Sequence, residues 1–104
     1  MTQLSNVTVT KAANIYFNGN VTSRTLTLAD GSTQSLGIMM PGEYEFGTVE
    51  KELMEIIAGQ VSVLLSGESD WLDVNAGESF NVPANSKFNI KVTELTDYCC
   101  SYIK

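Results

Sequence analysis

The stretch GESFNVPANSKFNIKV, residues 77–92, contains two turn signals and ends in an alternating segment. In that last segment, KFNIKV, the apolar residues Phe88, Ile90 and Val92 alternate with polar residues and so share one face. This period of two is typical of a half-buried β-strand. Gly77 and Pro83 are turn-forming residues. The stretch therefore predicts short strands separated by tight turns.

The same rhythm continues through the rest of the chain. Turn signals recur at 18–20, 29–32, 41–43, 58–60, 66–70, 75–78 and 83–86. Between them lie segments of strand-like composition at 21–28, 35–40, 60–65 and 87–92. Short strands at regular spacing predict an all-β sandwich or barrel.

The segment VEKELMEIIAG, residues 49–59, is the one that tests this prediction. Its residues Leu53, Ile56 and Ile57 could also lie on one face of a helix. The run is short, ends at Gly59 and is followed at once by an alternating strand, so a strand is favoured. We expect a hairpin that closes at Ala58-Gly59-Gln60.

Composition limits the possible partners. The 104 residues include six basic and twelve acidic side chains and no histidine, for a formal charge of −6. This excess of acid disfavours nucleic acid and anionic membranes as partners, although a small anion could still bind. The N-terminus does not have the pattern of a secretory signal, and no apolar run is long enough for a membrane helix, so a cytoplasmic protein is expected.

The two cysteines, Cys99 and Cys100, are adjacent. Their Cα atoms are about 3.8 Å apart, which is too close for an ordinary disulfide. If residues 97–103 form a strand, the two thiols point to opposite faces. We expect one thiol to be buried and the other to lie near solvent.

Residues 42–59 and 77–88 can be compared with the two motifs of metal-binding cupins, a class of small β-barrel proteins. Counting from Gly42 places Thr48 and Glu50 at the two histidine positions of the first motif. Counting back from Gly59 places Glu52 at the position of the acidic ligand. The middle spacer is two residues shorter than in the metal family.

The second motif matches at Gly77, Pro83 and Asn85, but Phe88 stands where a metal-binding cupin has histidine. Only Glu52 is then a ligand of the expected type. Divalent transition metals need several converging N, O or S donors. We therefore expect a cupin barrel with no metal and no other cofactor.

An extended segment would place Tyr44, Phe46, Thr48, Glu50 and Glu52 on one side, and so in one cavity. A second interpretation treats the glutamates as solvated surface residues and the aromatic residues as plain core. Both interpretations are open from the sequence.

Several motifs taken together carry a resemblance to a known family: GEYEF, the acidic residues at 50–52, AG before VSVLL, DW at 70–71 and AGESFNVP. Through them the chain resembles the pyrimidine/purine nucleoside phosphorylases, a family of small single-domain cupins. The resemblance begins near residue 14 and runs to the end, so residues 1–13 are predicted to be an N-terminal extension and 14–104 the cupin domain. It implies a cytoplasmic enzyme, often a homodimer. Such an enzyme uses phosphate to split purine and pyrimidine ribonucleosides into free base and ribose 1-phosphate.

This chemistry assigns expected roles to the candidate residues. A carboxylate can stabilise positive charge at the anomeric carbon, and a protonated acid can assist the departing base. The catalytic candidates are Glu52 and Glu50, with Thr48 as a hydrogen-bond donor. Aromatic rings would hold sugar and base, because every base has a π face. The expected aromatic contacts are Tyr44, Phe46, Phe80 and Phe88.

The phosphate site is the least defined part. Its candidates are Arg24, Lys87, the hydroxyl of Ser86 and backbone N–H groups at 83–87. Two rival functions fit the same pattern: a non-enzymatic, metal-free cupin that binds a small metabolite, and a sugar isomerase or epimerase that uses a carboxylate or tyrosine as base.

Overall fold

Two antiparallel β-sheets make up the fold of the chain, seen in a computed structural model that describes residues 3–104. Its short 3-10 helix, η1, spans Phe17–Gly19. The strands are β1 (Thr8–Val9), β2 (Asn14–Tyr16), β3 (Val21–Thr27), β4 (Thr33–Met39), β5 (Gly42–Gly47), β6 (Lys51–Ala58), β7 (Gln60–Leu65), β8 (Leu72–Asn75), β9 (Ser79–Val82), β10 (Lys87–Val92) and β11 (Thr96–Ile103).

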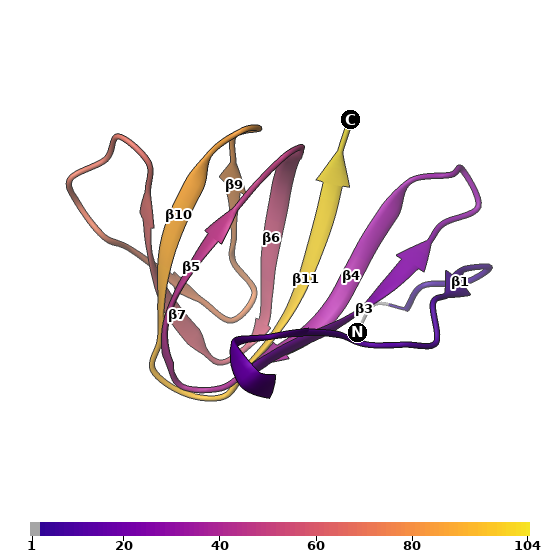
Figure 1. Cartoon of the computed structure of the whole chain (residues 1–104), viewed down its shortest axis with the longest axis horizontal. Helices are drawn as coiled ribbons and strands as arrows, with labels where there is room; N and C mark the ends of the chain where they lie inside the picture. The colour runs from indigo at the N-terminus through magenta and orange to yellow at the C-terminus, as the bar shows by residue number, and fades with distance from the viewer. Residues whose placement is uncertain (1–2) are drawn as a thin grey trace.

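The large sheet has the strand order β1-β3-β4-β11-β6-β9, with β2 paired to β3, and the small sheet has the order β5-β10-β7-β8. In Figure 1 the small sheet lies to the left, and β11, β4 and β3 extend to the right. Strands that are neighbours in a sheet are mostly distant in sequence, as in the cupin barrel. The prediction of an all-β cupin is confirmed.

Alternation along each strand explains the core. In β10 the residues Phe88, Ile90 and Val92 are buried, and they pair with β7 on one side and β5 on the other. Strand β7 repeats the pattern with Val61 and Val63. Period-2 sequences form strands here because one face of each sheet packs against the other sheet.

The segment at 49–59 is a strand, as predicted, but the predicted hairpin is wrong. Strand β6 pairs with β11 and β9 in the large sheet, whereas β7 pairs with β10 and β8 in the small sheet. Gly59 carries the chain from one sheet to the other with φ of +94°. Added at this position, a Cβ would lie 2.5 Å from Thr96 Oγ1. The glycine turn at this position was predicted correctly. The alternation of apolar residues along β6 does not show which strands pair with it.

The expectation for the cysteines is half right. Cys99 and Cys100 are both free thiols, on opposite faces of β11. Both are buried, so the prediction of one thiol near solvent is wrong. Strand pairing places Leu36 and Glu55 on either side of Cys99, and its thiol donates to Gln34 Oε1 at 3.7 Å. Burial raises the pKa of the Cys99 thiol to about 11.

The N-terminal segment adds to the edge of the large sheet. Within the predicted extension, Thr8 and Val9 pair with Thr27 and Leu26 of β3. Strand β2 pairs with the other end of β3, and η1 follows it directly. Within residues 3–104, no helix is both long and apolar enough to cross a membrane.

Candidate functional site

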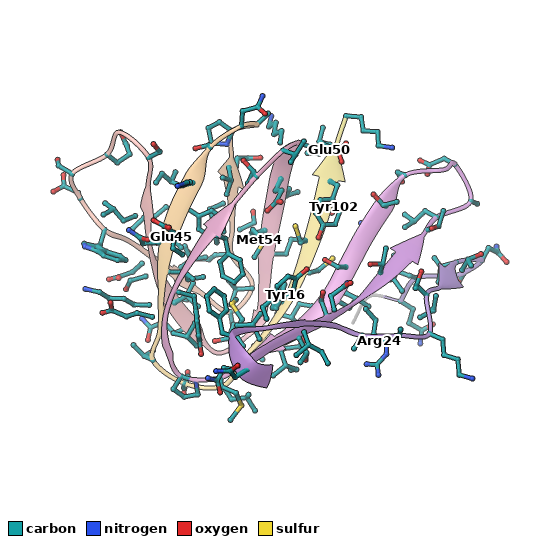
Figure 2. The ribbon with its side chains drawn as sticks, in the orientation of Figure 1. Tyr16, Arg24, Glu45, Glu50, Met54 and Tyr102 are labelled. Carbon is teal, nitrogen blue, oxygen red and sulfur yellow. The ribbon has the colours of Figure 1, made fainter. Side chains whose placement is uncertain are left out.

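A cavity of about 290 Å³ lies between the two sheets. Its lining comes from β2, β3, β4, β5, β6, β10 and β11 and from the connection between β5 and β6. Figure 2 shows Met54 and Tyr102 in the space between the sheets and Arg24 on the outer side of the large sheet. The lining residues are Tyr16, Ser23, Ser35, Met39, Phe46, Gly47, Val49, Glu50, Glu52, Met54, Phe88, Tyr98, Cys100 and Tyr102.

The predicted alternation along 44–52 persists across the junction between sheets. Phe46 from β5, Glu50 from the connection and Glu52 from β6 all line the cavity. Tyr44 and Thr48 are also buried but do not line it. The structure therefore brings the acidic pair and Phe46 into one site.

Thr48 ties the connection between β5 and β6 to the turn before β10. Its hydroxyl donates to the carbonyl of Pro83 at 2.7 Å and accepts from the N–H of Ser86 at 3.0 Å. Its own N–H donates to the carbonyl of Ser86 at 2.8 Å. These bonds occupy the hydroxyl that was expected to contact substrate, and they fix the start of the segment that carries Glu50.

Aromatic rings form one wall of the cavity. Phe46 and Phe88 stack with centroids 5.6 Å apart and an interplanar angle of 26°. Tyr16 meets Phe46 edge-on, with centroids 6.4 Å apart. Behind this wall, Tyr44 contacts Phe46, and Phe80 contacts Phe88 edge-on. Of the four predicted aromatic residues, Phe46 and Phe88 reach the cavity while Tyr44 and Phe80 support them.

Glu52 is partly buried, and its surroundings change its proton affinity. Burial raises the pKa of its carboxyl above the usual value, the Cys100 thiol opposes this by hydrogen bonding, and the nearby charge of Glu50 adds to the rise. Its pairing partner across the strands is Tyr102. A carboxyl in this setting holds a proton more tightly than one in water, which suits a role in proton transfer.

A group of polar residues opposite the aromatic wall was not recognised from the sequence. Ser23, Ser35, Tyr98 and Tyr102, on β3, β4 and β11, line the cavity together with Cys100. Burial raises the pKa of the Tyr98 phenol to about 12 and also raises the pKa of the Tyr102 phenol and the Cys100 thiol. These groups are therefore neutral donors. The available signal was the alternation in DYCCSY, which puts residues 98, 100 and 102 on one face.

The predicted phosphate candidates lie elsewhere. Arg24 is exposed and its Nε donates to the carbonyl of Lys11 at 3.2 Å. Lys87 is exposed at the start of β10, and Ser86 uses its N–H on Thr48. The N–H of Asn85 donates to the carbonyl of Val49 at 3.3 Å. None of the lining residues within 3–104 is lysine or arginine.

The donor set of the cavity is poor for a metal ion. In the part of the chain that the structure describes, His, Cys, Asp and Glu form no group of three or more that could hold one. The cavity offers two carboxyls beside phenols, serine hydroxyls and a protonated thiol. First-row metals bind converging imidazole, thiolate and carboxylate donors instead.

Curated relatives match almost the whole chain. A protein from Hydrogenovibrio crunogenus named pyrimidine/purine nucleoside phosphorylase is 62% identical over 103 residues, which covers 99% of each chain. One of the same name from Sulfurimonas denitrificans is 59% identical and covers 100% of each chain. The alignment with the Sulfurimonas denitrificans protein extends over residues 1–13 as well.

Solved structures agree with the fold. A protein of unknown function from Acinetobacter sp. ADP1 is 38% identical, with a TM-score of 0.94 over 97% of this chain and 98% of that one. Oxalate decarboxylase from Bacillus subtilis, 17% identical, has a TM-score of 0.73 over 98% of this chain and 30% of that one, which indicates a shared fold alone.

The family itself is identified by a match that spans most of the domain. Residues 11–102 match the family described as pyrimidine/purine nucleoside phosphorylase, and this range includes every residue that lines the cavity. With the close relatives carrying the same name, the chain belongs to the pyrimidine/purine nucleoside phosphorylase family.

Proposed function

We propose that this chain is a phosphate-dependent nucleoside phosphorylase of broad specificity, which converts purine and pyrimidine ribonucleosides to free base and ribose 1-phosphate. The observation that carries the proposal is a family match over residues 11–102 together with a cavity in which an acidic pair faces an aromatic wall. The relatives' names supply the general activity.

The reaction exchanges one bond at C1′ of the ribose for another. A phosphate oxygen supplies the electron pair for the new bond to C1′ while the C1′–N bond breaks. The electron pair of that bond leaves with the base nitrogen, which takes up a proton. Positive charge develops on the sugar ring, and a nearby carboxylate stabilises it. Glu50 and Glu52 are the only acids in the lining of the cavity, in the described part of the chain.

The aromatic wall accounts for the breadth of substrates. Phe46 and Phe88 present stacked rings, and Tyr16 borders them nearer the surface. Stacking recognises the π face of a base and not its hydrogen-bonding edge, so purines and pyrimidines bind alike. Thr48 acts indirectly, by positioning the segment that carries Glu50.

The reaction needs no metal ion or other cofactor, because phosphate itself is the nucleophile. The enzyme acts in the cytoplasm, where nucleosides and phosphate are both available. Its formal charge of −6 disfavours nucleic acid and anionic membranes as partners.

Phosphate dependence is the direct test of this function. Purified protein is incubated with uridine, guanosine or adenosine, with and without inorganic phosphate, and free base is measured by chromatography. We expect base to be released from each nucleoside only when phosphate is present. Release without phosphate would indicate a hydrolase instead, and intact nucleoside in both conditions would favour the metabolite-binding cupin.

The enzyme works as a homodimer that joins two copies through the outer face of the large sheet. Leu36 and Ile38 on β4 and Ile57 on β6 are 38%, 38% and 46% exposed, on the two strands that flank β11 in this face. Strand pairing places Ile38 next to Asp97 of β11, between β4 and β6. Apolar side chains clustered on one sheet face are typical of an interface between copies.

A charge in this face should separate the copies. We expect Ile38→Glu to raise the dimer dissociation constant at least about 30-fold, as loss of a central apolar contact does. Sedimentation equilibrium measures this. Leu72→Glu, at an exposed leucine of the small sheet, is the matched control and should leave the dimer intact. A wild-type monomer, or a variant that dimerises normally, would contradict the assignment.

A further inference from the structure

The cavity must hold an anion without help from a cationic side chain, if the proposed phosphorolysis takes place there. Its lining residues, all within the described range, include two acids and no lysine or arginine. The N–H groups of Asn85 and Ser86 in the turn before β10 already have acceptors. Another set of donors is therefore required.

The hydroxyl wall, which we define as Ser23, Ser35, Tyr98 and Tyr102, offers such a set. These residues lie on the adjacent strands β3, β4 and β11 and all line the cavity. Ser23, Ser35 and Tyr98 are only 4%, 2% and 6% exposed, so they sit at its buried end. A hydrogen bond from a buried hydroxyl to an anion is stronger than one at the surface, because little water competes for either partner.

Two of these O–H groups remain available to a ligand. Ser23 Oγ accepts from Asn14 Nδ2 at 3.2 Å, and its own O–H interacts with the Tyr98 hydroxyl oxygen, which leaves the Tyr98 proton to point elsewhere. The Tyr98 hydroxyl is 3.5 Å from the carbonyl of Thr22, at the outer limit of a hydrogen bond. Ser35 and Tyr102 lie 2.9 Å apart, so one donates to the other and one proton is left over. The wall can therefore offer two donors to one tetrahedral anion, one from Tyr98 and one from the Ser35–Tyr102 pair.

Glu52 stands beside this wall and has an unusual proton affinity. It pairs across the strands with Tyr102. The titratable groups that influence its carboxyl are Cys100 on β11 and Glu50 on the connection before β6, and its own charge raises the pKa of the Tyr98 and Tyr102 phenols on β11. Burial raises the pKa of its carboxyl. An anion bound nearby would raise that pKa further, because two negative charges repel strongly at low dielectric.

We propose that the hydroxyl wall is the phosphate subsite and that Glu52 shares one proton with the bound phosphate. The proposal rests on the proposed phosphorolysis and assigns the anion to the β3, β4 and β11 side of the cavity. Glu52 then faces the phosphate, and Glu50 is left for the ribose. The single shared proton removes the repulsion between carboxylate and anion.

This arrangement distinguishes between tetrahedral anions. Near neutral pH inorganic phosphate and arsenate each keep at least one proton, which can donate to the Glu52 carboxylate. Sulfate has none, so Glu52 must either draw a proton from solvent at a cost or face a sulfate oxygen with no hydrogen between them. A buried acceptor that has no donor carries a free-energy penalty. This penalty is large enough to weaken the binding of sulfate tenfold or more relative to phosphate.

The first test removes single hydroxyls from the wall. Tyr98→Phe and Tyr102→Phe keep the rings and each should raise the KM for phosphate about 10- to 100-fold, while the KM for uridine changes less than about threefold. Ser101→Ala, at a serine between Cys100 and Tyr102 that does not line the cavity, is the control and should change neither constant. An unchanged KM for phosphate in both variants would overturn the assignment of the subsite.

The second test needs no turnover. Phosphate, arsenate and sulfate are titrated into the ligand-free protein near neutral pH and followed by calorimetry. Wild type should bind phosphate and arsenate similarly and sulfate at least about tenfold more weakly. In Glu52→Gln the amide can donate to any of the anions, so the gap should shrink to about threefold or less. Equal affinity of wild type for sulfate and phosphate, or no binding of phosphate, would refute the shared proton.

The two proposals fail in different ways. A wild-type protein that releases no base with phosphate present would refute the phosphorylase function itself. Phosphate-dependent release that does not respond to changes in the hydroxyl wall would leave that function intact and refute only the subsite.

Discussion

Replacing Glu52 with glutamine is expected to lower kcat for phosphorolysis about 100-fold or more, with little change in nucleoside affinity. Glutamine has nearly the same shape, but it can neither carry a negative charge nor take up a proton. Both properties matter most as the phosphate oxygen bonds to C1′, because the proton that Glu52 shares with phosphate must then be held on the carboxyl. Losses of this size are typical when one acid–base or charge-stabilising group is removed.

The measurement separates turnover from binding. Initial rates of base release give kcat, and a titration of uridine without phosphate gives its dissociation constant, which should change less than about threefold. Glu55→Gln is the matched control, since Glu55 lies on the same strand but is exposed and does not line the cavity. Turnover by Glu52→Gln equal to that of the wild type would remove this residue from the mechanism.

Local patterns predicted the strands of this fold well but not their partners. The alternation in KFNIKV and QVSVLL matches β10 and β7 residue for residue. The same reasoning joined β6 and β7 in a hairpin, although they belong to different sheets. Periodicity reports which face of a strand is buried. The choice of neighbour depends on contacts distant in sequence, such as those between β6 and β11.

The candidate site was predictable on one side only. Counting residues from Gly42 and Gly59 pointed to Glu50 and Glu52, and both line the cavity. The opposite side consists of serines and tyrosines spread over β3, β4 and β11, with no motif that sets them apart from ordinary strand residues. Their common surroundings arise only when the large sheet forms, because Ser23 and Tyr98 are 75 positions apart and meet across β4.

Gly37 is the residue through which fold and site are linked. It lies on β4 between Ser23 of β3 and Tyr98 of β11. A Cβ at this position would lie 2.1 Å from the carbonyl oxygen of Thr22 and 2.8 Å from the Tyr98 hydroxyl oxygen. The absence of a side chain therefore lets the Tyr98 ring cross β4 toward β3.

Gly37→Ala is expected to destabilise the protein by about 2–3 kcal/mol, because overpacking against backbone cannot be relieved by a rotamer change. For a domain of this size that corresponds to a fall in Tm of roughly 10 °C or more, measured by thermal denaturation. The displaced Tyr98 hydroxyl should also raise the KM for phosphate. Gly47→Ala is the stability control, since the nearest atom to its added Cβ would be 3.9 Å away. A Tm for Gly37→Ala equal to that of the wild type would contradict this account. It would show that the close approach of the Tyr98 ring to β4 does not set the shape of the cavity.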